Sequence, residues 1–281
     1  METTKELLQK VINKRDNDSY KGTYGRVLLI GGLYPYGGAI IMAATACVNS
    51  GAGLVTVATD KENIMPLHSH LPEAMAFAID DLPLMKQNLE ASDVILIGPG
   101  LGESSRSKML LKQVMQVVSD EQILIIDGSA LNVLANIKQV HFETNHLILT
   151  PHQKEWERLS GITIAEQTDE KTKEALSHFP NNSILVAKSH ETSVFQGEHD
   201  QKIEAGGPHQ SIGGMGDTLA GMIAGFSAQF RENLFDTVVA ATYLHSLIAD
   251  ELALNAYVVR PTQISSEIPR WMRQIVDEEK N

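Results

Sequence analysis

The chain has a single cysteine, Cys47, among its 281 residues. An internal disulfide is therefore impossible, and because Cys47 lies in an apolar stretch of small residues, we expect a buried, unreactive thiol. Basic residues are also scarce, since 23 lysines and arginines stand against 35 acids and leave a formal net charge of −12. This charge disfavours general binding to nucleic acid or to an anionic membrane.

Two sorting signals are missing as well. No apolar run is long enough to span a bilayer, and the first six residues lack the basic-then-apolar layout of a signal peptide. We therefore expect a cytoplasmic protein without a membrane partner. No linker rich in proline, serine or glycine divides the chain, so residues 1–281 are expected to form one domain.

The sequence does contain a repeated alternation of short apolar runs and helix-like segments. Continuous runs such as 26–30 are typical of strands that are buried on both faces of a parallel sheet. The further predicted strands are 54–58, 93–97, 123–126, 147–150 and 183–187, and a short hairpin is predicted with arms at 192–197 and 202–205. The predicted helices are 4–14, 39–50, 104–118, 131–134, 152–159, 217–230, 233–254 and a last one after residue 262. This order predicts an α/β fold, a three-layer α/β/α sandwich with a mostly parallel central sheet.

Each predicted strand ends in a cluster of glycine, proline, aspartate, histidine or lysine. Ligands of open parallel sheets bind outside the carboxyl ends of the strands, so these clusters should meet at one functional edge. One competing interpretation is a dinucleotide site in which Asp60 contacts a ribose. The glycines at 31–32 and 37–38 do not form the G-x-G-x-x-G motif, and this interpretation therefore ranks below the others.

The most glycine-rich turn, residues 211–217, leads into a helix. The first N–H groups of a helix have no partner within it, and together with the helix dipole they attract an anion, most often a phosphate. A purely structural glycine turn explains this pattern about equally well. Small residues farther along the helix predict close packing against the sheet or a ligand; they are Ala220, Gly221, Ala224 and Gly225.

Taken together, these motifs resemble the ribokinase-like superfamily and, within it, the ADP-dependent NAD(P)H-hydrate dehydratases. The resembling segments occur in order along nearly the whole chain: 21–27, 31–32, 37–39, 98–102, 127–132, 150–152, 188 and 214–217. The resemblance implies a lyase that repairs hydrated NADH or NADPH while ADP is consumed to AMP and phosphate. It also implies a homo-oligomer, with a tetramer as one form, and an epimerase as a separate protein because the chain has no room for a second domain.

The resemblance also assigns residues. It places the hydrated dinucleotide against Ala39, Gly102, His152 and Asp217, and the adenine nucleotide against Lys188, Ser189, His190, Glu191, Thr192 and Gly216. Backbone N–H groups of Gly214, Met215 and Gly216 would stabilise the phosphoryl group in transit. Asp217 would be the catalytic base on the ring hydroxyl of the hydrate. Mg²⁺ is expected with the nucleotide, with Glu155 placed like a superfamily acid near magnesium, although no cluster of metal ligands stands out.

Structural roles remain open for three of these side chains. Lys188 would be a solvated surface lysine, His152 a helix cap and Asp217 an ordinary acid in a first helical turn. The helix dipole would lower the pKa of Asp217 and desolvation would raise it, and the sequence does not decide between them. The chain departs from the family pattern at Tyr20, Ser129, 153–154 and Ser189, which bears on metal handling and nucleotide contacts.

Two rival functions remain open. The first is an ATP-dependent kinase of a small heterocycle that carries a hydroxymethyl or hydroxyethyl group, and it would use the same turn and the same base. The second is a nucleotide-binding sensor without turnover. The combination of Asp217, Lys188 and His152 disfavours the sensor, because a sensor does not need a base.

Overall fold

The computed structural model describes residues 4–278. In this part of the chain a nine-stranded sheet has the order β3-β2-β1-β4-β5-β6-β7-β8-β9. The strands from β3 to β7 in this order are parallel, and β8 and β9 are antiparallel to their neighbours. The strands are β1 Arg26–Ile30, β2 Leu54–Thr59, β3 Met75–Ala78, β4 Val94–Ile97, β5 Ile123–Ile126, β6 Leu147–Leu149, β7 Ile184–Ala187, β8 Ser193–Gln196 and β9 His199–Lys202.

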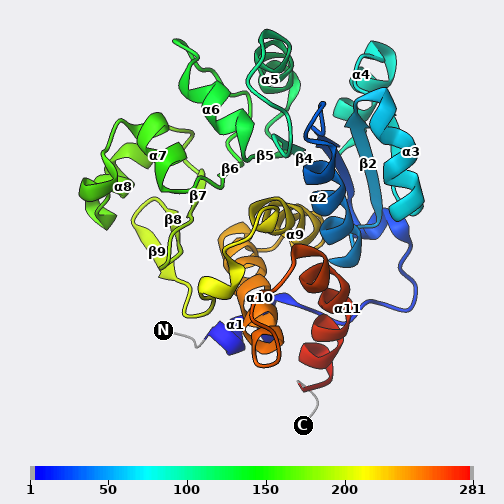
Figure 1. Ribbon diagram of the computed structural model, residues 1–281, viewed down its shortest axis with the longest axis vertical. Coiled ribbons are helices and arrows are strands. Elements are labelled where there is room, and N and C mark those ends of the chain that lie inside the picture. The colour runs from blue at the N-terminus through cyan, green and yellow to red at the C-terminus, as the bar shows by residue number, and fades with distance from the viewer. Residues whose placement is uncertain (1–3, 279–281) are drawn as a thin grey trace.

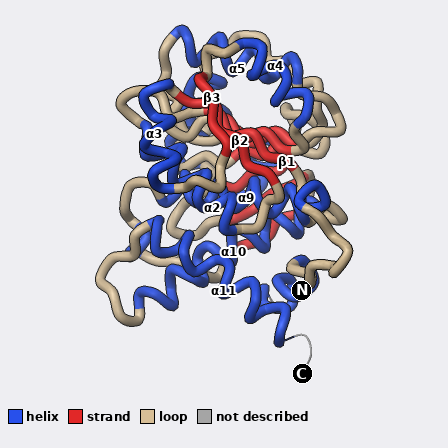
Figure 2. The backbone as a smooth tube through the Cα atoms, turned by 90° about the vertical axis from the view of Figure 1, so that its right-hand side faces the viewer, coloured by secondary structure: helices blue, strands red, loops and turns tan. Residues whose placement is uncertain are grey.

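Helices cover both faces of the sheet (Figures 1 and 2). One face is covered by α1 Thr4–Val11, α2 Gly37–Asn49, α9 Met215–Gln229, α10 Leu234–Ala253 and α11 Pro261–Glu278, with α3 Lys61–His70 at its edge. The other face is covered by α4 Leu82–Ala91, α5 Ser105–Val117, α6 Ser129–Ala135, α7 Gln153–Ser160 and α8 Asp169–Leu176. The predicted three-layer sandwich with a mostly parallel sheet is confirmed. No described helix has both the length and the apolar character of a membrane span.

Strand β1 shows how the apolar runs form this architecture. Val27 and Leu29 pack into the core on the α2 and α9 side, whereas Leu28 and Ile30 pack into the core on the α5 side. None of the four side chains is more than 1% exposed. Successive side chains of a strand point to opposite faces, so a strand covered on both sides has to be apolar at every position.

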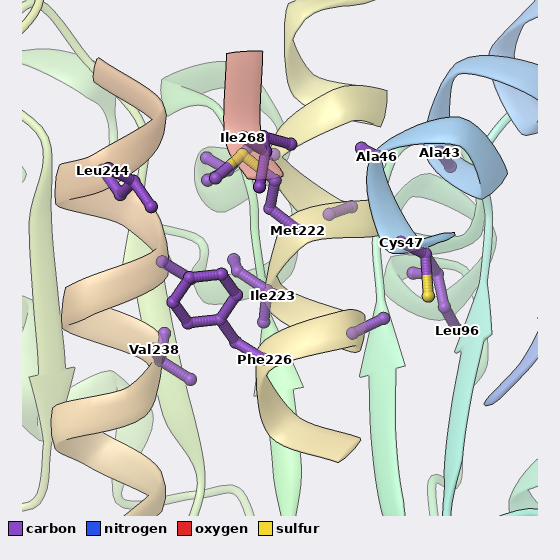
Figure 3. Packing of buried hydrophobic residues seen from close by; sticks show 14 of the residues in the cluster. Ala43, Ala46, Cys47, Leu96, Met222, Ile223, Phe226, Val238, Leu244 and Ile268 are labelled. Carbon is purple, nitrogen blue, oxygen red and sulfur yellow. The ribbon is translucent and has the colours of Figure 1, made fainter. Parts of the chain in front are cut away.

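Helices α2 and α9 pack against each other unusually closely. A Cβ atom at Gly221 would clash with the carbonyl oxygen of Ala43, and one at Gly225 would lie 2.8 Å from the carbonyl oxygen of Cys47. In Figure 3, Phe226 points from α9 toward α10, while Cys47 lies on the α2 side. The prediction that the small residues of α9 face the sheet or a ligand is therefore wrong for these two glycines, because they face α2.

The same packing buries Cys47 completely as a free thiol. Burial raises the pKa of this thiol well above its usual range, because the interior disfavours the thiolate. The thiolate is the reactive form of cysteine. The expectation of a buried, unreactive thiol is thus confirmed.

Several boundaries differ from the predicted ones. Helix α9 begins two residues earlier than expected, at Met215, and the second hairpin arm is 199–202 rather than 202–205. The sequence pattern also missed α3, β3 and α4, which occupy the stretch between residues 61 and 91, and it missed α8. Helix α3 contains Pro66 and has a weak apolar stripe, and only Phe77 in strand β3 is fully buried, so neither segment shows a clear period.

Candidate active site

The carboxyl ends of β5, β6 and β7 meet beside the first turn of α9. The backbone N–H of Lys188 donates to the carbonyl of Pro151 at 2.9 Å and so joins the ends of two adjacent strands. The side chain of Lys188 extends to Asp127, where Nζ lies 3.1 Å from Oδ1. Because only 21% of the Lys188 side chain is exposed, the interpretation as a solvated surface lysine is wrong.

The glycine turn leaves the start of α9 open to a ligand. Gly214 is the N-cap residue with φ at +92°, and no side chain caps this end of the helix. A Cβ at Gly216 would lie 3.1 Å from Nζ of Lys188, so the amine adjoins the positive end of the helix dipole. Two positive groups placed together favour an anion beside them. This arrangement supports the anion-binding interpretation of the turn over a purely structural one.

Asp217 lies on the first turn of α9 and is largely buried. Its pKa is raised to about 6, first by burial and then by the negative charge of Asp127. The positive charge of Lys188 and the backbone work in the opposite direction but are outweighed. Desolvation therefore prevails over the charge of Lys188 and the backbone hydrogen bond. A carboxylate that is ionised at pH 7 and still has a pKa close to neutrality suits general-base catalysis.

His152 caps helix α7, as its structural interpretation predicts. Its Nδ1 accepts hydrogen bonds from the backbone N–H groups of Lys154 and Glu155 at 3.1 and 3.3 Å. Burial and the nearby charge of Lys188 lower the pKa of His152, so the ring is neutral at pH 7. Because Nδ1 accepts, the ring proton is on Nε2. Nε2 makes one long contact, 3.5 Å from Oε1 of Glu155, and the His152 side chain is 55% exposed.

Glu155 completes the reciprocal cap. Its Oε2 accepts a hydrogen bond from the backbone N–H of His152 at 2.8 Å. Burial raises the pKa of Glu155 to about 6. Burial also disfavours the charged form of Lys188, but the attraction of Asp127, Glu155 and Asp217 outweighs this effect and raises the pKa of the lysine. Three acids therefore surround one firmly protonated lysine.

A cavity of about 620 Å³ opens beside this group of side chains. Among the residues assigned to the nucleotide, Lys188, Ser189, His190, Thr192 and Gly216 line it. Glu191 does not line this cavity; it pairs with Lys202 at 2.8 Å, and its backbone N–H donates to Oγ of Ser189. Residues 205–208, 210 and 211 also line the cavity.

His245 of α10 also lines this cavity and was missed by the sequence interpretation. It is 3% exposed, its Nδ1 lies 3.5 Å from Nε2 of Gln210, and its Nε2 has no hydrogen-bond partner. Burial, followed by the charge of Lys188, lowers the pKa of His245 to about 4. No local signal marks this residue, because it lies in the middle of an apolar helix.

Ala39 and Gly102, which are assigned to the hydrated dinucleotide, lie on the α2 side of the same helix start. A Cβ at Gly100 would lie 3.1 Å from that of Ala39, and one at Gly102 would lie 4.0 Å from the ring of Tyr36. One turn farther along α2, the thioether of Met42 abuts Gly214. The starts of α2 and α9 therefore adjoin.

Asp60 does not support the competing interpretation as a ribose ligand. Its Oδ2 accepts a hydrogen bond from the backbone N–H of Tyr34 at 2.7 Å, and its Oδ1 pairs with Arg106 at 3.1 Å. Both oxygens are engaged within the protein, which assigns Asp60 a structural role.

The chain was compared with known families and proteins. A family model described as NAD(P)H-hydrate dehydratase matches residues 27–270. The ADP-dependent (S)-NAD(P)H-hydrate dehydratase of Streptococcus thermophilus is 58% identical over 276 residues, which cover 98% of this chain and 99% of that protein. A solved ribokinase-like superfamily protein from Enterococcus faecalis is 45% identical with a TM-score of 0.93, covering 96% of this chain and 94% of that one.

A second solved structure is the ADP/ATP-dependent NAD(P)H-hydrate dehydratase from Bacillus subtilis, which was co-crystallised with ATP and Mg²⁺. It is 27% identical with a TM-score of 0.84, and the match covers 96% of this chain and 97% of that one. The family match, the near-complete coverage and the shared architecture agree. This chain belongs to the NAD(P)H-hydrate dehydratase family and has the ribokinase-like fold.

Proposed function

We propose that this chain is an ADP-dependent NAD(P)H-hydrate dehydratase, a lyase that returns hydrated NADH or NADPH to the intact cofactor. In this reaction ADP is converted to AMP and phosphate. The observation that carries the assignment is the 58% identity to an ADP-dependent (S)-NAD(P)H-hydrate dehydratase over nearly the full length of both chains. The arrangement of Lys188 and Asp217 around the open start of α9 supports it.

The first step is a phosphoryl transfer. Asp217 accepts the proton of the ring hydroxyl, and the hydroxyl oxygen attacks the β-phosphorus of ADP while the bond to AMP breaks. Negative charge on the transferred group is stabilised by the backbone N–H groups of Gly214, Met215 and Gly216 and by the amine of Lys188. Their location at the helix start supports this role.

The second step is an elimination. The phosphate ester is a better leaving group than hydroxide, and the lone pair of the ring nitrogen helps to expel phosphate. Loss of a proton from the adjacent ring carbon to water then restores the dihydronicotinamide. We propose that Ala39 and Gly102 contact the hydrate and that the Nε2–H of His152 donates to its phosphate or carboxamide oxygen. The 55% exposure of the His152 side chain supports that assignment.

We propose Mg²⁺ as the companion of the nucleotide, where it would neutralise phosphate charge. In the described part of the chain, no group of three or more His, Cys, Asp or Glu side chains could hold a metal ion. The described side chains therefore do not fit a metal site in which the protein supplies all the ligands. Three acids, Asp127, Glu155 and Asp217, surround the single positive charge of Lys188. This negative surplus is compatible with a Mg²⁺ ion that enters bound to the phosphates of the nucleotide, and we propose no protein ligand for it.

The remaining expectations concern the setting of the enzyme. We propose a cytoplasmic homo-oligomer, with a tetramer as one form, in which residues 1–281 form a single domain. The relative from Streptococcus thermophilus is named for the S form of the hydrate. A dehydratase selective for the S epimer requires another activity to convert the R epimer to it, and we propose a separate epimerase for this role.

One assay tests the function. Chemically hydrated NADH or NADPH is incubated with the protein, Mg²⁺ and either ADP or ATP, and recovery of dihydronicotinamide absorbance is followed. We expect recovery with ADP, and the ATP arm measures the nucleotide preference. The proposal fails if neither nucleotide restores absorbance while a heterocyclic alcohol is phosphorylated with ATP.

A further inference from the structure

Asp127 is a buried carboxylate to which the mechanism above assigns no step. It follows strand β5, and its side chain is 1% exposed. Its Oδ1 accepts a hydrogen bond from Oγ1 of Thr150 at 2.6 Å and another from Nζ of Lys188 at 3.1 Å. A buried carboxylate is costly to a fold unless it is paired. The pairing explains how the protein tolerates Asp127, and the location of its partner points to a use.

The first consequence concerns the position of the Lys188 amine. A lysine side chain is long and flexible, and the positive end of a helix dipole repels its ammonium group. Nζ nevertheless lies beside the first turn of α9, 3.1 Å from the Cβ position of Gly216. Asp127 is the only residue whose side chain forms an ion pair with Lys188 in the described chain. Without it, the amine would be free to swing into the adjoining cavity.

The second consequence concerns the base. The charged groups that affect Asp217 are Asp127, which follows β5, and Lys188, which follows β7. Their charges act on Asp217 in opposite directions, and the effect of Asp127 is the larger. Asp127 therefore influences both Lys188 and Asp217, the two side chains that act in the proposed phosphoryl transfer. The proposed mechanism does not require Asp127 to touch the substrate.

We infer that Asp127 is a positioning residue, which holds the Lys188 amine against the start of α9 and sets the electrostatic field in which Asp217 accepts its proton. The inference rests on the proposed function. It adds Asp127 to that function as a residue that acts through Lys188 and Asp217.

The test is Asp127→Asn, which keeps the size of the side chain and an acceptor for Thr150 but removes the charge. We expect ADP affinity to fall about tenfold, because loss of one charged pairing is worth about 1–2 kcal/mol. We also expect the acid limb of the pH dependence of kcat/KM to move to lower pH, because Asp217 loses a negative neighbour. Equal affinity and an unmoved acid limb in a folded variant would overturn the inference.

Two further variants separate positioning from a general loss of structure. Asp60→Asn makes the same change at another strand-end aspartate paired with a cation, Arg106, outside the site. We expect it to leave ADP affinity and the acid limb unchanged. In a double-mutant cycle, Asp127→Asn should weaken ADP binding no further once Lys188→Met is present, because Asp127 acts on the nucleotide through Lys188. Additive losses in ADP affinity would contradict the inference.

ADP binding measured by calorimetry does not depend on turnover, so the inference and the proposed function can fail separately. If the wild-type protein binds ADP but does not repair the hydrate, the proposed function fails. The affinity comparison then still tests whether Asp127 positions Lys188. Thermal unfolding checks that each variant is folded, and an unfolded Asp127→Asn protein is replaced by Asp127→Glu. In that variant the displaced carboxylate should also weaken ADP binding, and unchanged affinity would overturn the inference.

Discussion

Two helices, α7 and α9, begin at the same edge of the sheet and begin differently. The start of α7 is closed by its own side chains, since His152 and Glu155 cap each other's backbone N–H groups. The start of α9 has Gly214 at its N-cap and no side-chain cap. At a capped helix start the first backbone N–H groups donate to side chains of the protein, whereas at an uncapped start they can donate to an anion. The difference leaves the start of α9, and not that of α7, with backbone donors for an anion.

The largest effect is expected from Asp217→Asn, which removes the proposed base from the open helix start. Turnover should fall by about 10²–10⁴, the range for loss of a general base, while ADP binding is retained. Single-turnover recovery of dihydronicotinamide absorbance measures the loss. Turnover near the wild-type rate would remove Asp217 from the mechanism.

The same variant should be more stable than the wild type at alkaline pH. Folding raises the pKa of Asp217 from 3.8 to about 6, so its ionised form destabilises the fold above pH 6, and the penalty disappears below pH 4. We expect the free energy of unfolding of Asp217→Asn at pH 8 to exceed that of the wild type by ~1–2 kcal/mol. Urea unfolding at pH 8 and pH 4 measures this difference, and an equal difference at both values would rule out the titration of Asp217 as its cause.

The pH dependence of the wild-type enzyme is the next effect in size. Since Asp217 has to be ionised to accept a proton and its pKa is about 6, kcat/KM should fall about tenfold per pH unit below pH 6. Glu155 titrates in the same range. The variant Glu155→Gln should keep the acid limb of kcat/KM. Loss of this limb in the variant would show that it reports the titration of Glu155 and not that of Asp217.

A smaller effect is expected from Gly214→Ala. Gly214 has φ at +92°, so alanine there is strained by about 1 kcal/mol, and its Cβ would press on Met42. Displacement of the turn should lower kcat/KM about tenfold, which corresponds to about 1.4 kcal/mol of transition-state stabilisation.

Gly161→Ala is the matched control for this glycine. Gly161 ends helix α7 with φ at +76°, and its Cβ position faces open space. We expect a similar loss of stability, measured by thermal unfolding, with activity unchanged. Equal losses of activity in the two variants would show that the α9 turn matters only for the fold.

The smallest effects separate the two uses of His152. Asparagine is a good helix cap, so His152→Asn should retain stability, whereas His152→Ala should lose about 1 kcal/mol. Both variants lack the Nε2–H donor and should raise KM for the hydrate by roughly threefold to tenfold, the equivalent of one hydrogen bond. Steady-state kinetics and thermal unfolding measure the two properties. A wild-type KM in His152→Asn would show that His152 caps the helix and does not bind the hydrate.

Local patterns predicted most of the fold. The apolar runs became the inner strands because a strand covered on both faces requires apolar side chains at each position, as in β1. The stretch from α3 to α4 was missed because Pro66 lies inside α3 and strand β3 is short with only one buried residue. For the site, the family resemblance named Lys188, His152 and Asp217. The contact of Asp127 with Lys188 joins residues 61 positions apart in sequence and has no local signal.

By itself the sequence determined the alternation of strands and helices, the strand ends where polar residues collect and the glycine turn before α9, because each depends on neighbouring residues. The tertiary structure alone decided the state of those residues. It buried Lys188 against Asp127, left α9 uncapped while α7 capped itself, and raised the pKa of Asp217 to about 6. The burial of these side chains and the charges around them depend on segments far apart in the chain, so a local sequence pattern cannot predict them.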